Sequence, residues 1–196
     1  MKVFIATGNK KKIDEIKPLL KDFEVLSIAD GINIPEVEEN SDTFEGNSQK
    51  KALEIAKFLN MVAIADDSGL MVDALEGEPG VYSARYAGEN ANDSDNNKKL
   101  IQNLKGIGNR KAKFVSVISV AKPNGEVHSF RGEVEGLILD EARGNSGFGY
   151  DPYFDEVANG KTFAELELSK KKAIRHRVRD IKKKKKEIKD ILKTEN

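Results

Sequence analysis

The sequence contains no cysteine and only two histidines, His128 and His176, among its 196 residues. The absence of cysteine excludes disulfides, thiolate nucleophiles and cysteine-ligated zinc or iron–sulfur sites. Two imidazoles are too few for a histidine-rich metal centre, so any metal must be bound by carboxylates, which favours Mg²⁺ or Mn²⁺. No apolar run approaches the ~18 residues that a membrane-spanning helix needs, and no signal-peptide cleavage site follows Met1. We therefore expect a cytoplasmic protein with no membrane partner.

Charge is balanced overall, with 33 basic and 33 acidic residues, but it is unevenly distributed. Residues 169–196 contain 13 basic and 4 acidic side chains, so the rest of the chain is acidic. A basic end is compatible with a nucleic-acid partner, but the acidic remainder of the chain argues against one. We interpret the lysine run at 182–186 as a solvated helix face.

The pattern of apolar residues predicts a mixed α/β fold in a single domain, residues 1–196. Helical spacing predicts helices at 13–20 and 100–107, a helix from an Asp42 N-cap to Asn60, and a last helix after Ser169 whose Ile188 and Leu192 face the core. The turn Pro123-Asn124-Gly125 predicts a hairpin, so the sheet is expected to be partly antiparallel. Apolar runs predict strands at 3–6, 25–28, 62–65, 114–120 and 127–139.

Two segments place charged groups where a predicted strand ends. Thr7-Gly8-Asn9-Lys10-Lys11-Lys12 leads into a helix, where backbone N–H groups and lysines favour an anion. It lacks the spacing of a P-loop, and an ordinary turn is an equal alternative. Asp66-Asp67-Ser68-Gly69 places two adjacent carboxylates whose repulsion a divalent cation would relieve, with Glu39 as a further oxygen ligand. Such a carboxylate either holds the metal or accepts a proton from water, whereas the structural alternative is a β-turn.

Residues 144–152 combine three glycines with Phe148 and Tyr150. Glycines allow a backbone to approach a flat ligand, an aromatic ring stacks on it, and Asp151 accepts from a ring N–H. The equally weighted alternative is a turn whose aromatic rings fill the core. On their own, His176 and Arg177 at the start of the last helix are typical surface residues.

Taken together and in order, these segments resemble the inosine triphosphate pyrophosphatase family, whose members hydrolyse non-standard purine nucleotides. The last of the matching motifs usually reads Ser-His-Arg, and Arg175 replaces its serine here. The matching stretches are Ala6-Thr7-Gly8-Asn9-x-x-Lys12-x-x-Glu15, Thr43-Phe44-x-x-Asn47, Ala65-Asp66-Asp67-Ser68-Gly69-Leu70, Pro79-Gly80-x-Tyr82-Ser83-Ala84-Arg85-Tyr86, Phe148-Gly149-Tyr150-Asp151-Pro152 and His176-Arg177.

The resemblance implies a two-lobed α/β fold, with a long mixed sheet flanked by helices and a central nucleotide-binding cleft. It also implies a homodimer that hydrolyses ITP, dITP and XTP to the monophosphate and pyrophosphate with Mg²⁺, or Mn²⁺ as a substitute. By the same resemblance, Asp67 is the general base and a metal ligand, and Glu39 is the second ligand. The implied substrate contacts are Thr7, Gly8, Asn9, Lys10, Lys11, Lys12, Ser68, Phe148, Gly149, Tyr150, Asp151, Lys171, His176 and Arg177.

Selection among purine nucleobases can be predicted from their hydrogen-bonding groups. Hypoxanthine and xanthine present an O6 acceptor where adenine presents an amino donor, so a donor from His176 or Arg177 would select against adenine. Two alternatives stay open: a related pyrophosphatase that acts on modified pyrimidine nucleotides, and a nucleic-acid-binding protein that uses the basic C-terminus.

Overall fold

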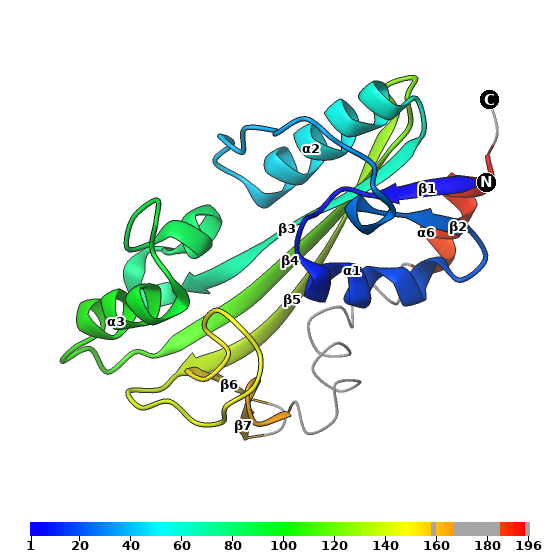
Figure 1. The fold of residues 1–196 in the computed structure, drawn as a ribbon. Helices are drawn as coiled ribbons and strands as arrows, with labels where there is room; N and C mark the ends of the chain where they lie inside the picture. The colour runs from blue at the N-terminus through cyan, green and yellow to red at the C-terminus, as the bar shows by residue number, and fades with distance from the viewer. Residues whose placement is uncertain (158–159, 167–184, 195–196) are drawn as a thin grey trace. The chain divides into compact units, whose positions relative to one another are not determined.

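The computed structural model describes residues 1–157, 160–166 and 185–194. Short 3₁₀ segments lie at Lys17–Leu20, Ile28–Asp30, Asp73–Leu75 and Gly80–Arg85. Within the described residues, no helix has both the length and the apolar character that crossing a membrane requires. The helices and strands are β1 (Lys2–Ile5), α1 (Lys10–Ile16), β2 (Glu24–Leu26), α2 (Phe44–Leu59), β3 (Val62–Val72), α3 (Asp93–Asn103), β4 (Lys111–Ala121), β5 (Val127–Ile138), β6 (Phe154–Glu156), β7 (Lys161–Thr162) and α6 (Lys185–Lys193), as drawn in Figure 1.

The strands form one mixed sheet in the order β2-β1-β3-β4-β5-β6-β7. β1 runs parallel to β2 and β3, whereas β6 is antiparallel to both β5 and β7. The predicted hairpin joins β4 to β5: the Lys122 N–H donates to the Glu126 carbonyl at 2.8 Å, and Gly125 has φ 97°. A residue with a side chain rarely adopts that φ, so glycine suits this turn. The predicted mixed α/β sheet is confirmed.

The chain divides into two compact units. Among the described residues, unit 1 comprises 1–67, 116–132 and 185–194, and unit 2 comprises 68–115, 133–157 and 160–166. Strands β3, β4 and β5 contribute residues to both units.

The core of unit 1 forms between α2 and one face of the sheet. Phe4 of β1 and Ala6, just after the strand, point to one face and pack with Ala52, Ile55 and Ala56 of α2. Small side chains let the helix approach the sheet closely, while the fully buried Ile55 contributes roughly 1.5–3 kcal/mol. Figure 1 shows α2 on one side of β1 and α1 on the other.

The end of the described chain also packs into unit 1. Ile188 and Leu192 of α6 are buried, at 2% and 0% exposure, as their spacing predicts. Lys189 on the same helix forms an ion pair with Asp22.

The core of unit 2 contains three phenylalanine rings. Phe154 and Phe163 lie 4.8 Å apart between ring centroids, and Phe114 contacts both at 6.5 and 5.9 Å. Leu100 and Leu104 of α3 are fully buried against them. Edge and tilted ring contacts of this kind add about 0.5–1.5 kcal/mol per pair beyond the area they bury.

Local hydrogen bonds place three element boundaries differently from the predictions. The N-cap of α2 is Thr43 rather than Asp42, because the Thr43 hydroxyl accepts from the Gly46 N–H at 3.0 Å. Helix α3 begins at Asp93, earlier than expected, because Asn92 and Asp95 form a reciprocal capping box ahead of the apolar residues. The first helix becomes 3₁₀ at Lys17–Leu20, around Pro18, which lacks an N–H for the α-helical pattern.

The predicted end of the third strand at Ala65 is wrong. β3 continues from Val62 to Val72 through the Asp66-Asp67-Ser68-Gly69 segment, so these residues form extended strand rather than a β-turn. Leu70 and Val72 are fully buried beyond it, which favours continued pairing in the sheet. The two aspartates are therefore presented by a strand, where neighbouring side chains point to opposite faces.

A candidate carboxylate site in unit 1

Asp66 lies buried on β3 and forms an ion pair with the first helix. Its Oδ2 lies 2.8 Å from the Lys12 Nζ, and the residue is 6% exposed. Burial by itself would lower the pKa of Lys12, but the charge of Asp66, with smaller effects from Asp67 and Glu39, raises it above its usual value. Lys12 therefore stays charged, and it responds to three carboxylates at once.

Asp67 accepts a hydrogen bond from a side chain of α2. The Asn47 Nδ2 donates to the Asp67 Oδ2 at 3.1 Å. Burial raises the pKa of Asp67 to about 7, the charges of Glu39 and Asp66 add to this, and Asn47 and Lys12 oppose it. A carboxylate with a pKa near neutrality is suited to accept a proton from water.

The acidic loop that precedes α2 is anchored by lysines of that helix. Lys51 Nζ lies 3.4 Å from the Glu39 Oε1, and Lys50 Nζ donates to the Glu38 carbonyl at 2.8 Å. Gly46 permits this approach, because a Cβ at that position would overlap the Ser41 Oγ. Glu39 is in this way held where its charge acts on both Lys12 and Asp67.

The segment from Thr7 to Lys12 is organised by its own side chains. Thr7 is buried, and its hydroxyl accepts from the Asn9 N–H at 3.1 Å. Asn9 caps α1 by accepting from the Lys11 N–H at 3.0 Å. Lys10 and Lys11 are exposed, as is Gly8, whereas Lys12 is half-buried and forms the ion pair with Asp66. The predicted strand, turn and helix around an N-terminal cluster of lysines is confirmed as structure.

These carboxylates have the chemistry that a hard divalent cation needs. The Asp66 Oδ1 is buried and has no hydrogen-bond partner in the described part of the chain, and an oxygen left in that state favours a cation. Within residues 1–157, 160–166 and 185–194, no cluster of three or more acidic or histidine side chains forms a ready-made metal centre.

In unit 2, the glycine-rich loop at 144–152 is held by hydrogen bonds that its own residues and α3 supply. The Gly149 N–H donates to the Asp93 Oδ2 at 2.8 Å, and the Asn97 Nδ2 donates to the Gly149 carbonyl at 2.9 Å. The Asp151 Oδ2, in a residue that is 2% exposed, accepts from the Phe148 N–H at 3.0 Å. Asp151 therefore shapes the loop backbone, while Phe148 is half-buried.

Tyr150 belongs to the core. This agrees with the alternative interpretation of the loop, a turn whose aromatic rings fill the core. Tyr150 is 5% exposed, and its hydroxyl donates to the Ser83 carbonyl at 2.7 Å. The Ser83 hydroxyl in turn accepts from the Leu70 N–H at 2.9 Å and donates to the Gly80 carbonyl at 2.6 Å. Ser83 thus connects β3 to the glycine-rich loop through hydrogen bonds.

Ser68, a predicted substrate contact on β3, is half-buried.

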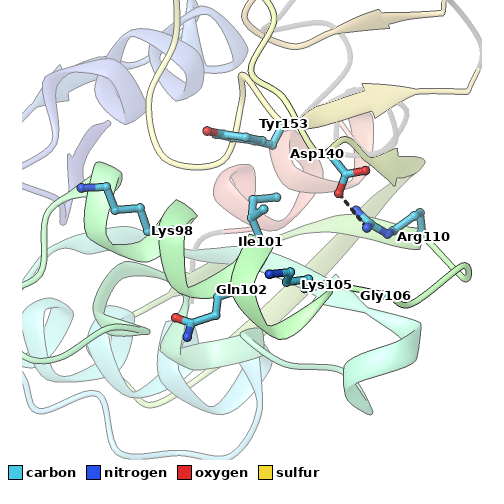
Figure 2. A pocket seen from close by; sticks show the side chains of 8 residues that line it. All are labelled: Lys98, Ile101, Gln102, Lys105, Gly106, Arg110, Asp140 and Tyr153. Atoms are coloured by element: carbon cyan, nitrogen blue, oxygen red, sulfur yellow. Dashed lines mark hydrogen bonds and ion pairs between the residues drawn. The ribbon is translucent and has the colours of Figure 1, made fainter.

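Figure 2 shows a separate cavity of about 600 Å³ in unit 2, with Tyr153 above Ile101 and the Arg110–Asp140 pair beside them. Arg110 lies 2.7 Å from Asp140 and also donates to the carbonyls of Leu104 and Ile107. Arg110 therefore ties the end of α3 to the following chain, and the one carboxylate in the cavity is already paired. The remaining lining residues are Lys98, Gln102, Lys105 and Gly106. We place the candidate site at the carboxylates of unit 1 because the cavity has no comparable pair.

Three predicted contacts, Lys171, His176 and Arg177, lie outside the described residues, as does Arg175. Conversely, sequence reasoning assigned no role to Asn47 or Lys51, which hold Asp67 and Glu39. The available signal was spacing: Asn47 lies four residues after the Thr43 cap, and Lys51 four residues after that, so the two share one helix face.

Fold and site together define the class: a mixed α/β protein with a buried lysine–carboxylate cluster suited to a cation and a polyanion. The sequence profile of the Ham1 family matches residues 3–193, so the chain belongs to the Ham1 family. The resemblance inferred from the sequence motifs is thereby confirmed.

Similar proteins support this assignment over nearly the whole chain. A dITP/XTP pyrophosphatase of Clostridium perfringens is 50% identical and covers 98% of this chain and 100% of its own. Another, from Desulforamulus reducens, is 49% identical and covers 93% of each chain. The structure of the Staphylococcus aureus Ham1 protein aligns with a TM-score of 0.87 at 43% identity, covering 97% of this chain and 99% of that one.

Proposed function

We propose that this protein hydrolyses non-standard purine nucleoside triphosphates, namely ITP, dITP and XTP, to the nucleoside monophosphate and pyrophosphate, and so removes them from the nucleotide pool. The observation that carries the proposal is the cluster of Lys12, Asp66, Asp67 and Glu39 in a chain about half identical to proteins named dITP/XTP pyrophosphatase.

Asp67 acts as the general base in this reaction. Its carboxylate takes a proton from a water molecule whose oxygen bonds to the α-phosphorus, while the bond from that phosphorus to the bridging oxygen breaks and pyrophosphate leaves. The raised pKa of about 7 makes the carboxylate basic enough for this transfer near neutral pH. No covalent intermediate with the protein is needed.

Glu39 and Asp67 would hold the Mg²⁺, for which Mn²⁺ is a substitute. When bound, the cation supplies charge neutralisation on the non-bridging phosphate oxygens. Lys12 brings a permanent positive charge to the same cluster, and the exposed Lys10 and Lys11 attract the polyphosphate.

The remaining proposed substrate contacts lie at the start of the chain, on β3, in the glycine-rich loop and in residues 171–177. Thr7, Gly8 and Asn9 contact the phosphates, as does Ser68. Phe148, Gly149, Tyr150 and Asp151 shape the base pocket, Tyr150 and Asp151 by supporting the loop rather than by stacking. Lys171, His176 and Arg177 contribute donors, and a donor aimed at O6 selects against adenine. We expect the active form to be a homodimer with no nucleic-acid partner.

A substrate panel tests the proposal directly. ITP, dITP and XTP are compared with ATP, GTP and dUTP in the presence of Mg²⁺, and pyrophosphate is assayed separately from phosphate. We expect pyrophosphate from the first three nucleotides at rates well above those of the others. Release of phosphate, preference for a pyrimidine nucleotide, or tight RNA binding at moderate salt with no pyrophosphate release would refute it.

A further inference from the structure

We infer that Asn47 is a positioning residue for the reaction: its side-chain amide fixes the orientation of the Asp67 carboxylate. The inference depends on the proposed role of Asp67 and adds a second residue, on a different element, to the same step. Asn47 does not need to touch the substrate, because it acts through the carboxylate that it holds.

Both the oxygen and the nitrogen of the Asn47 side-chain amide form hydrogen bonds, so the amide has only one favourable orientation. Its Oδ1 accepts from the Ser41 N–H at 2.8 Å, so its Nδ2 faces the Asp67 Oδ2, 3.1 Å away. A reversed amide would place its nitrogen against the Ser41 N–H, where neither group can accept. At 2% exposure the side chain has no room to turn away. The donor toward Asp67 is therefore built in.

A second hydrogen-bonded chain holds α2 in place around Asn47. The Gln49 Nε2 donates to the Ser129 Oγ at 2.9 Å, Ser129 and Ser119 are joined at 2.7 Å, and Ser119 and Ser48 at 2.6 Å. The Ser48 hydroxyl contacts the Glu45 carbonyl at 3.2 Å. Because the amide at one end only donates and the carbonyl at the other only accepts, all three hydroxyls point the same way.

This chain links α2 to β4 and β5 with residues on both sides of Asn47. Since Ser48 and Ser119 are fully buried, the helix cannot shift or rotate without leaving hydroxyl groups unpaired. The Asn47 amide is consequently carried on a fixed support. The amide therefore restricts rotation of the Asp67 carboxylate about its Cβ–Cγ bond, and its removal should impair both the approach of that carboxylate to water and its hold on a cation.

The experiment compares Asn47→Ala and Asn47→Asp with Ile55→Val as the matched control. Asn47→Asp keeps the shape and the acceptor for Ser41 but replaces the donor facing Asp67 by an oxygen. Ile55→Val removes one fully buried methyl group from the same helix, outside the hydrogen bonds that hold Asn47 and Asp67. For each variant we measure kcat and KM for dITP, the melting temperature, and the affinity of the substrate-free protein for Mn²⁺ by paramagnetic resonance of the unbound ion.

We expect both Asn47 variants to lose about 10–100-fold in kcat with KM changed less than about threefold, and Asn47→Ala to bind Mn²⁺ about tenfold more weakly. Ile55→Val should lower the melting temperature yet keep its kcat and its Mn²⁺ affinity. Full kcat in a folded Asn47→Asp protein, or equal losses of kcat in Ile55→Val, would overturn the inference. Asp67→Asn separates the two proposals. If Asp67→Asn remains active, the proposed role of Asp67 fails. If Asp67→Asn is inactive while both Asn47 variants keep full activity, only the role of Asn47 fails.

Discussion

The carboxylate cluster of unit 1 and the glycine-rich loop of unit 2 both bury polar groups, but they treat them differently. In the loop, Asp151 and the Tyr150 hydroxyl are engaged by nearby backbone groups. In the cluster, burial raises the pKa of Asp67, and one oxygen of Asp66 lacks a hydrogen-bond partner among the described residues. Compensated polar groups stabilise a shape, whereas an incompletely compensated charge favours an incoming cation or proton.

The sharpest test of the contrast is Asp67→Asn. The substitution keeps the shape of the side chain but removes its basicity, so we expect kcat/KM for dITP to fall by about 10³-fold with the circular dichroism spectrum unchanged. Pyrophosphate release under steady-state conditions measures the effect. Glu54→Gln, an exposed change on α2 of the same unit, is the control and should behave like the unmodified protein. Normal turnover in Asp67→Asn would move the reaction away from this cluster.

Tyr150→Ala tests the glycine-rich loop of unit 2, where we expect the side chain to contribute to the stability of the fold. The ring is 5% exposed and its hydroxyl is hydrogen-bonded, so we expect a loss of about 3–4 kcal/mol in the free energy of unfolding. Tyr82→Ala in the same unit should cost less than about 0.5 kcal/mol, because Tyr82 is 52% exposed. Urea denaturation compares the two. Equal losses would show that exposure does not separate these tyrosines energetically.

Gly147→Ala tests whether the stability of the loop depends on the close contact between Gly147 and Asp151. Gly147 has φ 84°, and a Cβ there would overlap the Asp151 Oδ2. We expect a loss of about 1–3 kcal/mol in the free energy of unfolding, together with a higher KM for dITP. Gly149→Ala is the comparison, since Gly149 also has a positive φ but open space around its Cα. If the two variants lose the same amount, backbone strain alone accounts for the effect.

The smallest expected effect is a pH dependence of stability in the metal-free protein. The pKa of Asp67 rises from an ordinary 3.8 to about 7 on folding, so its protonated form favours the folded state. That contribution is complete below pH 3.8 and disappears as the pH rises through 7. Asp67→Asn lacks this dependence, so we expect the difference between its melting temperature and that of the unmodified protein to be larger at pH 8 than at pH 5, in favour of Asp67→Asn. Thermal melts in chelator measure the difference, and a gap that narrows with rising pH would contradict the raised pKa.

Periodicity in the sequence is enough to predict most of the fold. Alternation and helical spacing locate α2, β5 and the buried face of α6, because burial of one face leaves a regular apolar repeat. The boundaries of α1 and α3 are less predictable, since capping by Asn9 and by Asn92 extends each helix beyond its apolar residues. Hydrogen-bonding residues, not hydrophobic ones, decide where those helices begin.

The local sequence of the Asp66-Asp67-Ser68-Gly69 segment does not predict its structure. Its composition is typical of a turn, because aspartate and serine readily bond to their own backbone. In the structure Lys12 and Asn47, distant in the sequence, engage the two carboxylates, and the buried Leu70 continues the strand. Tertiary partners thus replace the local hydrogen bonds that a turn would use.

By itself, the sequence determined which chemistries are open to this protein: without cysteine, and with its carboxylates and lysines grouped in short segments, it is directed to oxygen-ligated cations and anionic substrates. Only the tertiary structure decided which groups act on one another. Lys12 pairs with Asp66, Asn47 holds Asp67, and Tyr150 enters the core. These outcomes depend on burial and on contacts between residues far apart in the chain, and neither the desolvation of a charge nor the direction of an amide is encoded in any local pattern.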